Sequence, residues 1–229
     1  ARVTSLYLPT RIFDKHADTL FAACFRYQAA SGSSKKDICL RQVLFGPGKA
    51  SADSVRRAVA SLGKHRATLY SLYGSPQVGF PALATSLSAD TIKGVLAAGE
   101  GEVGLGTPVT DLTSVWIVGE SGEVADQGEL VLGGRTIAPG YFVGRGARPF
   151  VAAASLGASG LPHAAPGERV FRTGDIVRRL DSGTLLFLGR ADERLSLENF
   201  RLELAEVERA MVASPYVADA VAVVHERTD

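Results

Sequence analysis

Cysteine, long apolar runs and a surplus of charge of one sign are all scarce or missing in this sequence. The two cysteines, Cys24 and Cys39, have no metal-ligand partner at a useful spacing, which favours buried thiols in a reducing compartment. No apolar run reaches the roughly 18 residues that a membrane-spanning helix needs. The net charge is +1 and basic residues are spread along the chain, so we expect neither a nucleic-acid nor a membrane partner. Together these features predict a cytoplasmic globular protein.

Local signs of hydrolase and metal chemistry are also missing. The sequence has no G-x-S-x-G nucleophile elbow, and none of its histidines pairs with another at a metal-binding spacing. The histidines are His16, His65, His163 and His225. Gly99, Gly101 and Gly104 match the dinucleotide pattern G-x-G-x-x-G, but no strand precedes them, no helix follows, and the glutamates between them would repel phosphates. We interpret this stretch as a glycine-rich loop, and we expect no metal site.

Apolar residues make up 46% of the 229 residues, which is enough to form the core of one large or two small domains. Periodicity and turn residues predict helices at 9–28 and 51–63 and strands at 38–46 and 67–74. Ser51 or Asp53 is expected to cap the second helix. A strand, a helix and a strand within about 35 residues fit a βαβ unit, so we expect a parallel sheet here.

Glycine-broken β-rich runs follow residue 100 and predict antiparallel sheet or a barrel. A stretch rich in Ala, Gly, Pro and Ser at 144–169 is expected to be a long, partly mobile connection. Residues 170–190 predict a hairpin that turns at 181–183, "DSG". A helix at 204–214 and an apolar strand at 217–224 would form a second, small α/β unit.

Four segments occur in a specific order along the chain. They are "SLYGSPQ" at 71–77, "GELVLGGRTIAPGYF" at 128–142, "FRTGD" at 171–175 and "GRADERLSLENFRLELAEVE" at 189–208. The series resembles the motifs of the adenylate-forming superfamily, most closely those of the adenylation domains of nonribosomal peptide synthetases. "LRQVLFGPGKAS" at 40–51 also resembles the strand and turn that these enzymes write as GGEAL. The resemblance touches nearly the whole chain, but it covers only the middle and later part of such a domain.

The resemblance implies an α/β chain with part of the adenylate-forming fold. We expect an α/β part of the large subdomain at 1–98, a β-rich, barrel-like part at 99–191 and the beginning of the small C-terminal subdomain at 192–229. Family members use ATP and magnesium to convert an amino acid or another carboxylic acid into an acyl-adenylate. The acyl group then passes to a carrier-protein thiol.

Six positions match the family's adenosine site: Gly46, Gly48, Tyr73, Gly74, Asp175 and Arg190. The resemblance implies that the tyrosine ring lies on adenine and that the turn at Gly46 and Gly48 lies on the other side of the base. The aspartate, which only accepts hydrogen bonds, would hold the ribose hydroxyls, and the arginine would approach the ribose or phosphate. Asp192 matches the hinge about which the small C-terminal part rotates.

The phosphate end departs from the family pattern. Where the family has YGPTE this chain has YGSPQ, so Pro76 replaces the threonine that binds the α-phosphate and Gln77 replaces the glutamate that helps to hold magnesium. Proline offers neither a hydroxyl nor an N–H, and a neutral amide is a weaker magnesium ligand than a carboxylate. After the hinge, the family's KIRG is replaced by Ser196, Leu197, Glu198 and Asn199. Asn199 can still adopt a left-handed turn, so the local fold is expected to survive.

Three further family motifs are not found in the sequence. They are the Ser/Thr/Gly-rich phosphate loop, the aspartate that anchors the substrate amino group, and the C-terminal lysine that bridges carboxylate and α-phosphate. No lysine follows Lys93. Because phosphoryl chemistry depends on positioning and charge stabilisation, we expect neither a catalytic residue nor a cofactor in this chain.

We therefore interpret the chain as a truncated, degenerate adenylation domain that is folded but non-catalytic and acts as a structural or docking element in a nonribosomal peptide synthetase. Two alternatives stay open: a piece of an active amino-acid adenylating enzyme that flanking sequence completes, and a regulatory module that binds AMP or ATP. The expected partners are neighbouring condensation, adenylation or carrier domains, or a second copy of the chain. Half a domain leaves sheet edges and apolar surface that need such a cover.

Overall fold

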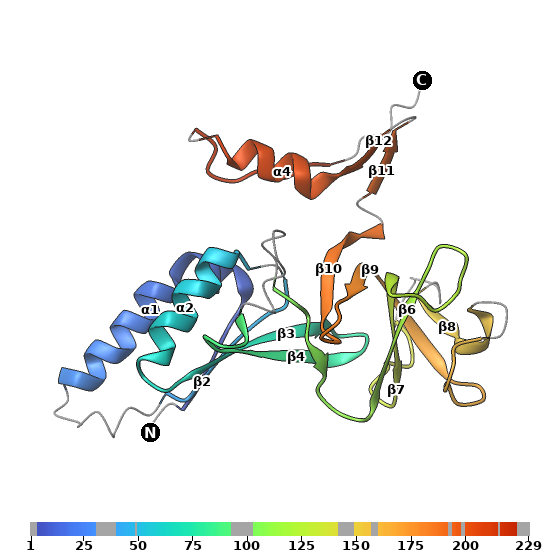
Figure 1. Cartoon of the computed structure of the whole chain (residues 1–229), viewed down its shortest axis with the longest axis horizontal. Helices are drawn as coiled ribbons and strands as arrows, with labels where there is room; N and C mark the ends of the chain where they lie inside the picture. The colour runs from blue at the N-terminus through green and yellow to red at the C-terminus, as the bar shows by residue number, and fades with distance from the viewer. Residues whose placement is uncertain are drawn as a thin grey trace.

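A computed structural model gives the structure of the chain. It describes residues 4–30, 40–48, 50–92, 103–141, 149–156, 160–191, 194–197, 200–214 and 216–223. Two sheets dominate this part of the chain, and a small C-terminal unit lies beyond them (Figure 1). The mixed α/β architecture confirms the predicted fold class.

The first sheet has five strands in the order β1-β2-β3-β4-β5. They are β1 (Ser5–Leu8), β2 (Gln42–Phe45), β3 (Thr68–Ser75), β4 (Gly79–Leu87) and β5 (Thr107–Pro108). The first three run parallel, as predicted, whereas β4 and β5 are antiparallel. The sequence did not indicate β1, β4 or β5. β1 and β5 are short, and β4 contains Pro81, which argues against a strand because proline cannot donate to the ladder.

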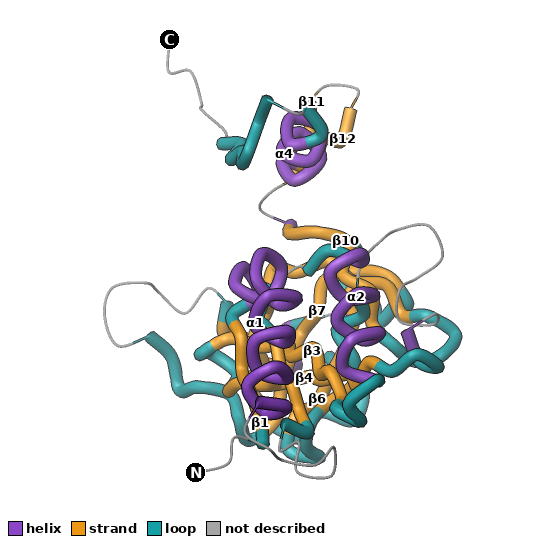
Figure 2. The backbone as a smooth tube through the Cα atoms, turned by 90° about the vertical axis from the view of Figure 1, so that its left-hand side faces the viewer, coloured by secondary structure: helices purple, strands orange, loops and turns teal. Residues whose placement is uncertain are grey.

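Two helices cover one face of this sheet: α1 (Thr10–Ala30) and α2 (Ala52–Gly63) lie side by side on it (Figures 1 and 2). Ser51 caps α2 by accepting a hydrogen bond from the Ser54 N–H, so Ser51 and not Asp53 is the cap. The Asp14 carboxylate of α1 accepts 3.0 Å hydrogen bonds from the Ser51 N–H and hydroxyl. The cap therefore also joins the two helices. No helix in the described ranges is long and apolar enough to cross a membrane.

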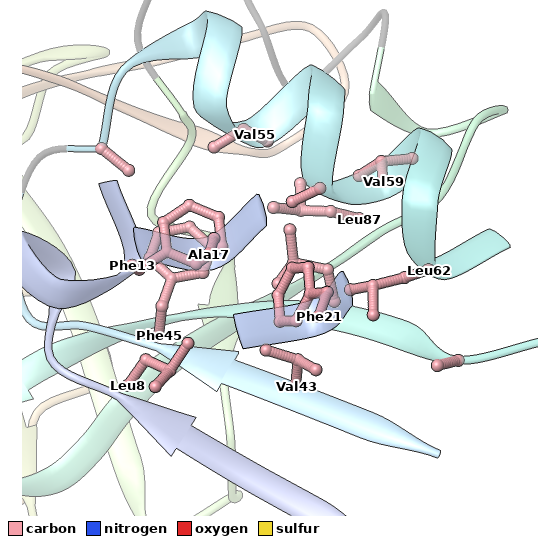
Figure 3. Close-up of a cluster of buried hydrophobic side chains, with 14 of the residues drawn as sticks. Leu8, Phe13, Ala17, Phe21, Val43, Phe45, Val55, Val59, Leu62 and Leu87 are labelled. Atoms are coloured by element: carbon pink, nitrogen blue, oxygen red, sulfur yellow. The ribbon is translucent and has the colours of Figure 1, made fainter. Parts of the chain in front are cut away.

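The apolar faces of the helices and sheet form one core (Figure 3). Phe13 and Phe21 of α1 and Leu62 of α2 are fully buried against the strands, and the Phe13 ring stacks on Phe45 with centroids 4.2 Å apart. Cys24, which we expected to be buried, is only partly buried. Cys39 lies outside the described residues.

The second sheet is antiparallel throughout its described pairs, as predicted. Its strands are β6 (Thr113–Val118), β7 (Gln127–Gly134), β8 (Phe150–Ala152), β9 (Arg169–Arg179) and β10 (Leu185–Arg190). β9 and β10 form the predicted hairpin, and Gly183 in its turn has a φ of +79°. The order is β10-β9-β7-β6, with β8 paired to β9. The inner face of this sheet packs against Val78, Ala82 and Leu83 at β4, so a second core joins the two sheets.

The stretch at 144–169, for which the sequence predicts a long, partly mobile connection, has regular structure among its described residues. It contains β8 and a short 3-10 helix, η2 (Ala153–Ser155). Leu156 and Leu161 pack with Trp116 on the outer face of the second sheet, and the Trp116 indole N–H donates a 2.9 Å hydrogen bond to the Pro162 carbonyl. Residues 144–148 and 157–159 lie outside the described part.

A small C-terminal unit follows β10 (Figures 1 and 2). It consists of the antiparallel strands β11 (Arg194–Leu197) and β12 (Phe200–Glu203) and the predicted helix, α4 (Leu204–Val212). The strand predicted at 217–224 is wrong for the described residues 216–223, which contain no strand. Val221 and Val223 remain 75% and 79% exposed, because no described neighbour forms a ladder with them.

We predict that Phe21→Ala lowers the free energy of unfolding by about 3–5 kcal/mol, because it leaves a cavity in the core of the first sheet. Urea unfolding followed by circular dichroism measures the change. Ile12→Ala on the same helix is the matched control: its side chain is 43% exposed, and the expected loss is about 1 kcal/mol or less. Equal losses in the two variants would show that the helix face is not packed as described.

Candidate functional site

A cleft of about 1100 Å³ opens where the carboxyl ends of β2 and β3 meet β9 and β10. Ligands of α/β sheets bind beyond the carboxyl ends of parallel strands, so this is the expected place for a site. Of the residues predicted from the sequence, the cleft is lined by Gly48, Tyr73, Gly74, Gln77, Asp175 and Arg190. The fold thus brings together positions that lie up to 142 residues apart in the chain (190 − 48 = 142).

The other predicted positions are not part of the lining. Gly46 is buried and precedes Pro47, which lines the cleft, and Pro76 is exposed. Ser196 lies in β11 opposite Arg201. The predicted hinge, Asp192, and the two altered positions 198 and 199 lie outside the described residues.

Tyr73, Asp175 and Arg190 form one connected group in the cleft. The Tyr73 hydroxyl donates to Oδ2 of Asp175, and Nη1 of Arg190 donates to Oδ1 at 2.9 Å. Asp175 is only 9% exposed, so its charge depends on these partners. Burial, followed by the charge of Asp175 and the hydrogen bond to it, raises the pKa of Tyr73 well above its usual value of 10.0. Tyr73 therefore remains a hydrogen-bond donor throughout the physiological pH range.

A bulge in β9 presents Asp175 to the cleft. The ladder with β7 pairs Val131 with Arg172 and Glu129 with Ile176, so one residue of β7 lies opposite residues 173–175 of β9. Gly174 has a φ of +75°, a left-handed conformation that favours glycine. Thr173 and Gly174 of the "TGD" motif thus have no described ladder partner, whereas Asp175 is unpaired with β7 but paired with Arg190 of β10.

The bulge is held by side-chain hydrogen bonds. The Thr173 hydroxyl donates to the Leu130 carbonyl at 2.7 Å and accepts from the Asp175 N–H at 3.0 Å. Glu129 accepts from the Gly174 N–H at 3.1 Å and from Nε of Arg172 at 2.9 Å. Reasoning from the sequence assigned no role to Glu129 or Arg172. Their opposite charges in the "GEL" and "FRTGD" motifs were the available signal, but the strand pairing that joins them was unknown.

The turn after β2 supports the opposite side of the cleft. A Cβ on Gly46 would lie 2.2 Å from the Leu72 carbonyl oxygen, so only glycine fits there. The Tyr7 hydroxyl donates to the Gly46 carbonyl at 2.5 Å, and the Thr10 hydroxyl donates to the Pro47 carbonyl at 2.8 Å. These bonds anchor the turn to β1 and to the start of α1, and Gly48 lines the cleft beside it.

The end of the cleft near Gln77 holds a neutral pair. The side-chain amide of Gln77 donates to the Tyr141 hydroxyl at 3.2 Å, and the backbone carbonyl of Gln77 accepts from the Ala138 N–H at 2.8 Å. The described residues contain no group of three or more His, Cys, Asp or Glu that could hold a metal ion. The two carboxylates in the lining, Asp175 and Glu129, each pair with an arginine. The described residues of the cleft therefore do not fit the magnesium ion that the family uses.

No protein-family model matches the chain, but individual proteins do. The chain is 36% identical to FrzA, a non-canonical nonribosomal peptide synthetase of Cladobotryum sp, over 157 residues. These residues cover 68% of this chain and 15% of FrzA. The chain is 30% identical to surfactin synthase subunit 1 of Bacillus subtilis over 186 residues, which cover 80% of this chain and 5% of that protein. The chain thus spans a small part of the length of these relatives.

Solved structures give the same result. PA1221, described as an NRPS protein containing adenylation and PCP domains, is 26% identical with a TM-score of 0.61, and the match covers 97% of this chain and 40% of that one. NpsA of Klebsiella oxytoca in complex with 3-hydroxyanthranilyl-AMSN has a TM-score of 0.71 at 19% identity, which supports the fold alone. That match covers 99% of this chain and 41% of NpsA.

The motif series, the fold and these similarities agree along nearly the full length of the chain. The chain belongs to the adenylation-domain family of nonribosomal peptide synthetases and corresponds to part of such a domain.

Proposed function

We propose that the chain is a degenerate, non-catalytic part of an adenylation domain and acts as a structural or docking element within a nonribosomal peptide synthetase. The observation that carries the proposal is the neutral phosphate end: Pro76 is exposed, and the Gln77 amide binds the Tyr141 hydroxyl. Neither residue supplies the hydroxyl or carboxylate that the family pattern places there. The proposal rests on positions 76 and 77, which lie well inside the chain.

The charges of the cleft support the same conclusion. Its charged lining residues form two ion pairs, Glu129 with Arg172 and Asp175 with Arg190. A triphosphate that enters the cleft would compete with these two carboxylates for the donors of the arginines. Stabilisation of the charge that develops during adenylate formation would lack a ready donor.

A docking role is supported by apolar side chains that remain at the surface. Tyr7 and Phe80 are 46% and 43% exposed, and their rings meet edge to face at 6.1 Å. Clustered exposed aromatic side chains are typical of contact surfaces. We propose that a neighbouring condensation, adenylation or carrier domain of the same cytoplasmic synthetase covers them, or else a second copy of the chain. The solved relative PA1221 contains an adenylation and a PCP domain in one protein.

The preserved half of the cleft favours a second candidate function, a regulatory module that binds AMP or ATP. Asp175 can accept ribose hydroxyls, and the Tyr73 ring beside it offers an aromatic face for a base. Such binding needs no phosphate chemistry, so it is compatible with the loss of catalysis.

We predict that the protein gives no amino-acid-dependent ATP–pyrophosphate exchange above a protein-free blank, since its phosphate end lacks the required groups. The decisive comparison uses a longer protein, extended in both directions along the synthetase. The unchanged longer protein should also be inactive. Pro76→Thr combined with Gln77→Glu should raise its exchange rate at least tenfold above that of the unchanged longer protein, because each charge-assisted contact is worth about 1.5–3 kcal/mol. Exchange by the longer protein without these changes would show an active enzyme of which this chain is one piece.

For the second candidate function, we predict that titration calorimetry detects AMP binding at millimolar concentration and that Asp175→Ala weakens it at least tenfold. Asp126→Ala is the matched control, because the Asp126 side chain is 89% exposed and lies outside the cleft lining. Absence of heat at millimolar AMP and ATP would exclude the nucleotide-binding module. Equal weakening in the two variants would place binding outside the cleft.

We predict that the isolated chain self-associates with rising concentration in multi-angle light scattering, because the Tyr7 and Phe80 rings are uncovered. Phe80→Ser should lower the mass towards that of a monomer. Val124→Ser, in the connection between β6 and β7 of the second sheet, serves as the control for removing a similarly exposed apolar side chain elsewhere (47%). A monodisperse monomer at all concentrations would exclude the second copy as a partner.

A further inference from the structure

We infer that Glu129 is a positioning residue for Asp175: it holds the bulge at 173–175 so that the Asp175 carboxylate faces the cleft. Glu129 lies on β7, and the bulge lies on β9. The inference deepens the second candidate function, and only its affinity measurement rests on nucleotide binding. Its other two measurements concern the free protein.

The two carboxylate oxygens of Glu129 accept hydrogen bonds from different partners. Oε1 accepts the Gly174 N–H at 3.1 Å, which ties the side chain to the backbone of the bulge. Oε2 accepts Nε of Arg172 at 2.9 Å, which offsets the negative charge of Glu129. The Glu129 side chain is only 12% exposed, whereas Arg172 is 48% exposed. The carboxylate is thus held between a backbone donor and a half-exposed cation.

The bulge needs an anchor of this kind because none of its three residues is paired with β7, and only Asp175 is paired with β10. The Asp175 N–H donates to the Thr173 hydroxyl, and Glu129 accepts the Gly174 N–H. A part-buried N–H that loses its acceptor is destabilising, because it has given up its hydrogen bond to water. Glycine has the widest conformational freedom of any residue, so a released Gly174 would adopt other conformations rather than keep a φ of +75°.

Movement of Gly174 would affect the charged groups of the cleft. Nη2 of Arg190 lies 3.0 Å from the place where a Cβ of Gly174 would be, so Arg190 packs directly on the bulge. Its Nη1 donates to the Thr173 carbonyl at 3.4 Å and to Asp175 at 2.9 Å. A shifted bulge would therefore disturb the pair of Asp175 with Arg190 and its hydrogen bond with Tyr73.

A purely structural role for the ion pair is the alternative, and three variants separate the roles. Glu129→Ala removes the ion pair and the acceptor for Gly174. Arg172→Ala removes the ion pair alone. Glu129→Gln keeps an oxygen that can accept the Gly174 N–H, so it should resemble Arg172→Ala if positioning is the function of Glu129.

The first measurement is the Gly174 amide signal in proton–nitrogen NMR spectra, which reports the hydrogen bond to Glu129. We expect it to move to lower proton frequency in Glu129→Ala and to stay near its native position in Arg172→Ala. The second is the set of Tyr73 ring carbon-13 signals at neutral pH, which report the hydrogen bond from the Tyr73 hydroxyl to Asp175. In Glu129→Ala a displaced Asp175 should move these signals, while Arg172→Ala should leave them near their native positions.

The third measurement is AMP affinity by calorimetry, which should fall at least tenfold in Glu129→Ala and less than threefold in Glu129→Gln. Equal effects of the alanine variants on the Gly174 signal and on the Tyr73 ring signals would overturn the positioning role. If the native protein binds no AMP, the second candidate function fails, and the two spectroscopic measurements still decide the role of Glu129. If Glu129→Ala does not fold, Glu129→Asp replaces it, because a side chain one methylene shorter keeps the charge but withdraws it from Gly174. Unchanged Gly174 and Tyr73 signals in Glu129→Asp would also overturn the inference.

Discussion

The hydrogen bond from the Tyr73 hydroxyl to Asp175 joins the two sheets at the base of the cleft. It runs from β3 in the first sheet to β9 in the second, and the apolar core around Leu83 and Leu130 closes the same junction from behind. A carboxylate as buried as Asp175 is stable only when it is paired and hydrogen-bonded. Tyr73 and Arg190 meet that requirement from different strands. The position of one carboxylate thus constrains β3, β9 and β10 together.

The two ends of the cleft differ in their chemistry. At the Tyr73 end, a carboxylate, a guanidinium group and an aromatic ring are joined by charge-assisted bonds. At the Gln77 end, an amide binds a phenol, and both are neutral. Recognition of a nucleoside needs hydrogen-bond acceptors and a ring face, whereas phosphate chemistry needs unpaired positive charge and a metal. The cleft therefore favours recognition over reaction, which is the distinction that the proposed function makes.

Much of this arrangement could be predicted from the sequence, because its signals are local. Helical periodicity predicted α1 and α2, and the "DSG" turn predicted the β9–β10 hairpin. The resemblance to family motifs indicated Tyr73, Asp175 and Arg190, which the structure brings into one cleft.

The failures concern pairings between distant segments. β8 and η2 were hidden because the Ala- and Gly-rich stretch gains its order only from Trp116 and the sheet beneath it. The strand expected at 217–224 has apolar alternation but no described partner, and a strand without a neighbour has nowhere to place its backbone hydrogen bonds. The role of Glu129 was hidden for the same reason, since it depends on the bulged register between β7 and β9.

The residues that match the family and those that depart from it also differ in structural importance. Gly46, Asp175 and Arg190 are each fixed by contacts within the chain, and replacing Gly46 would force its backbone away from Leu72. Pro76 lies exposed in the connection between β3 and β4, where proline is readily accommodated because no ladder bond is lost. A chain that needs only its fold would keep the first kind of residue and could lose the second without destabilisation. This division supports a structural role more strongly than the absence of any single catalytic group, because an active enzyme would need residues of both kinds.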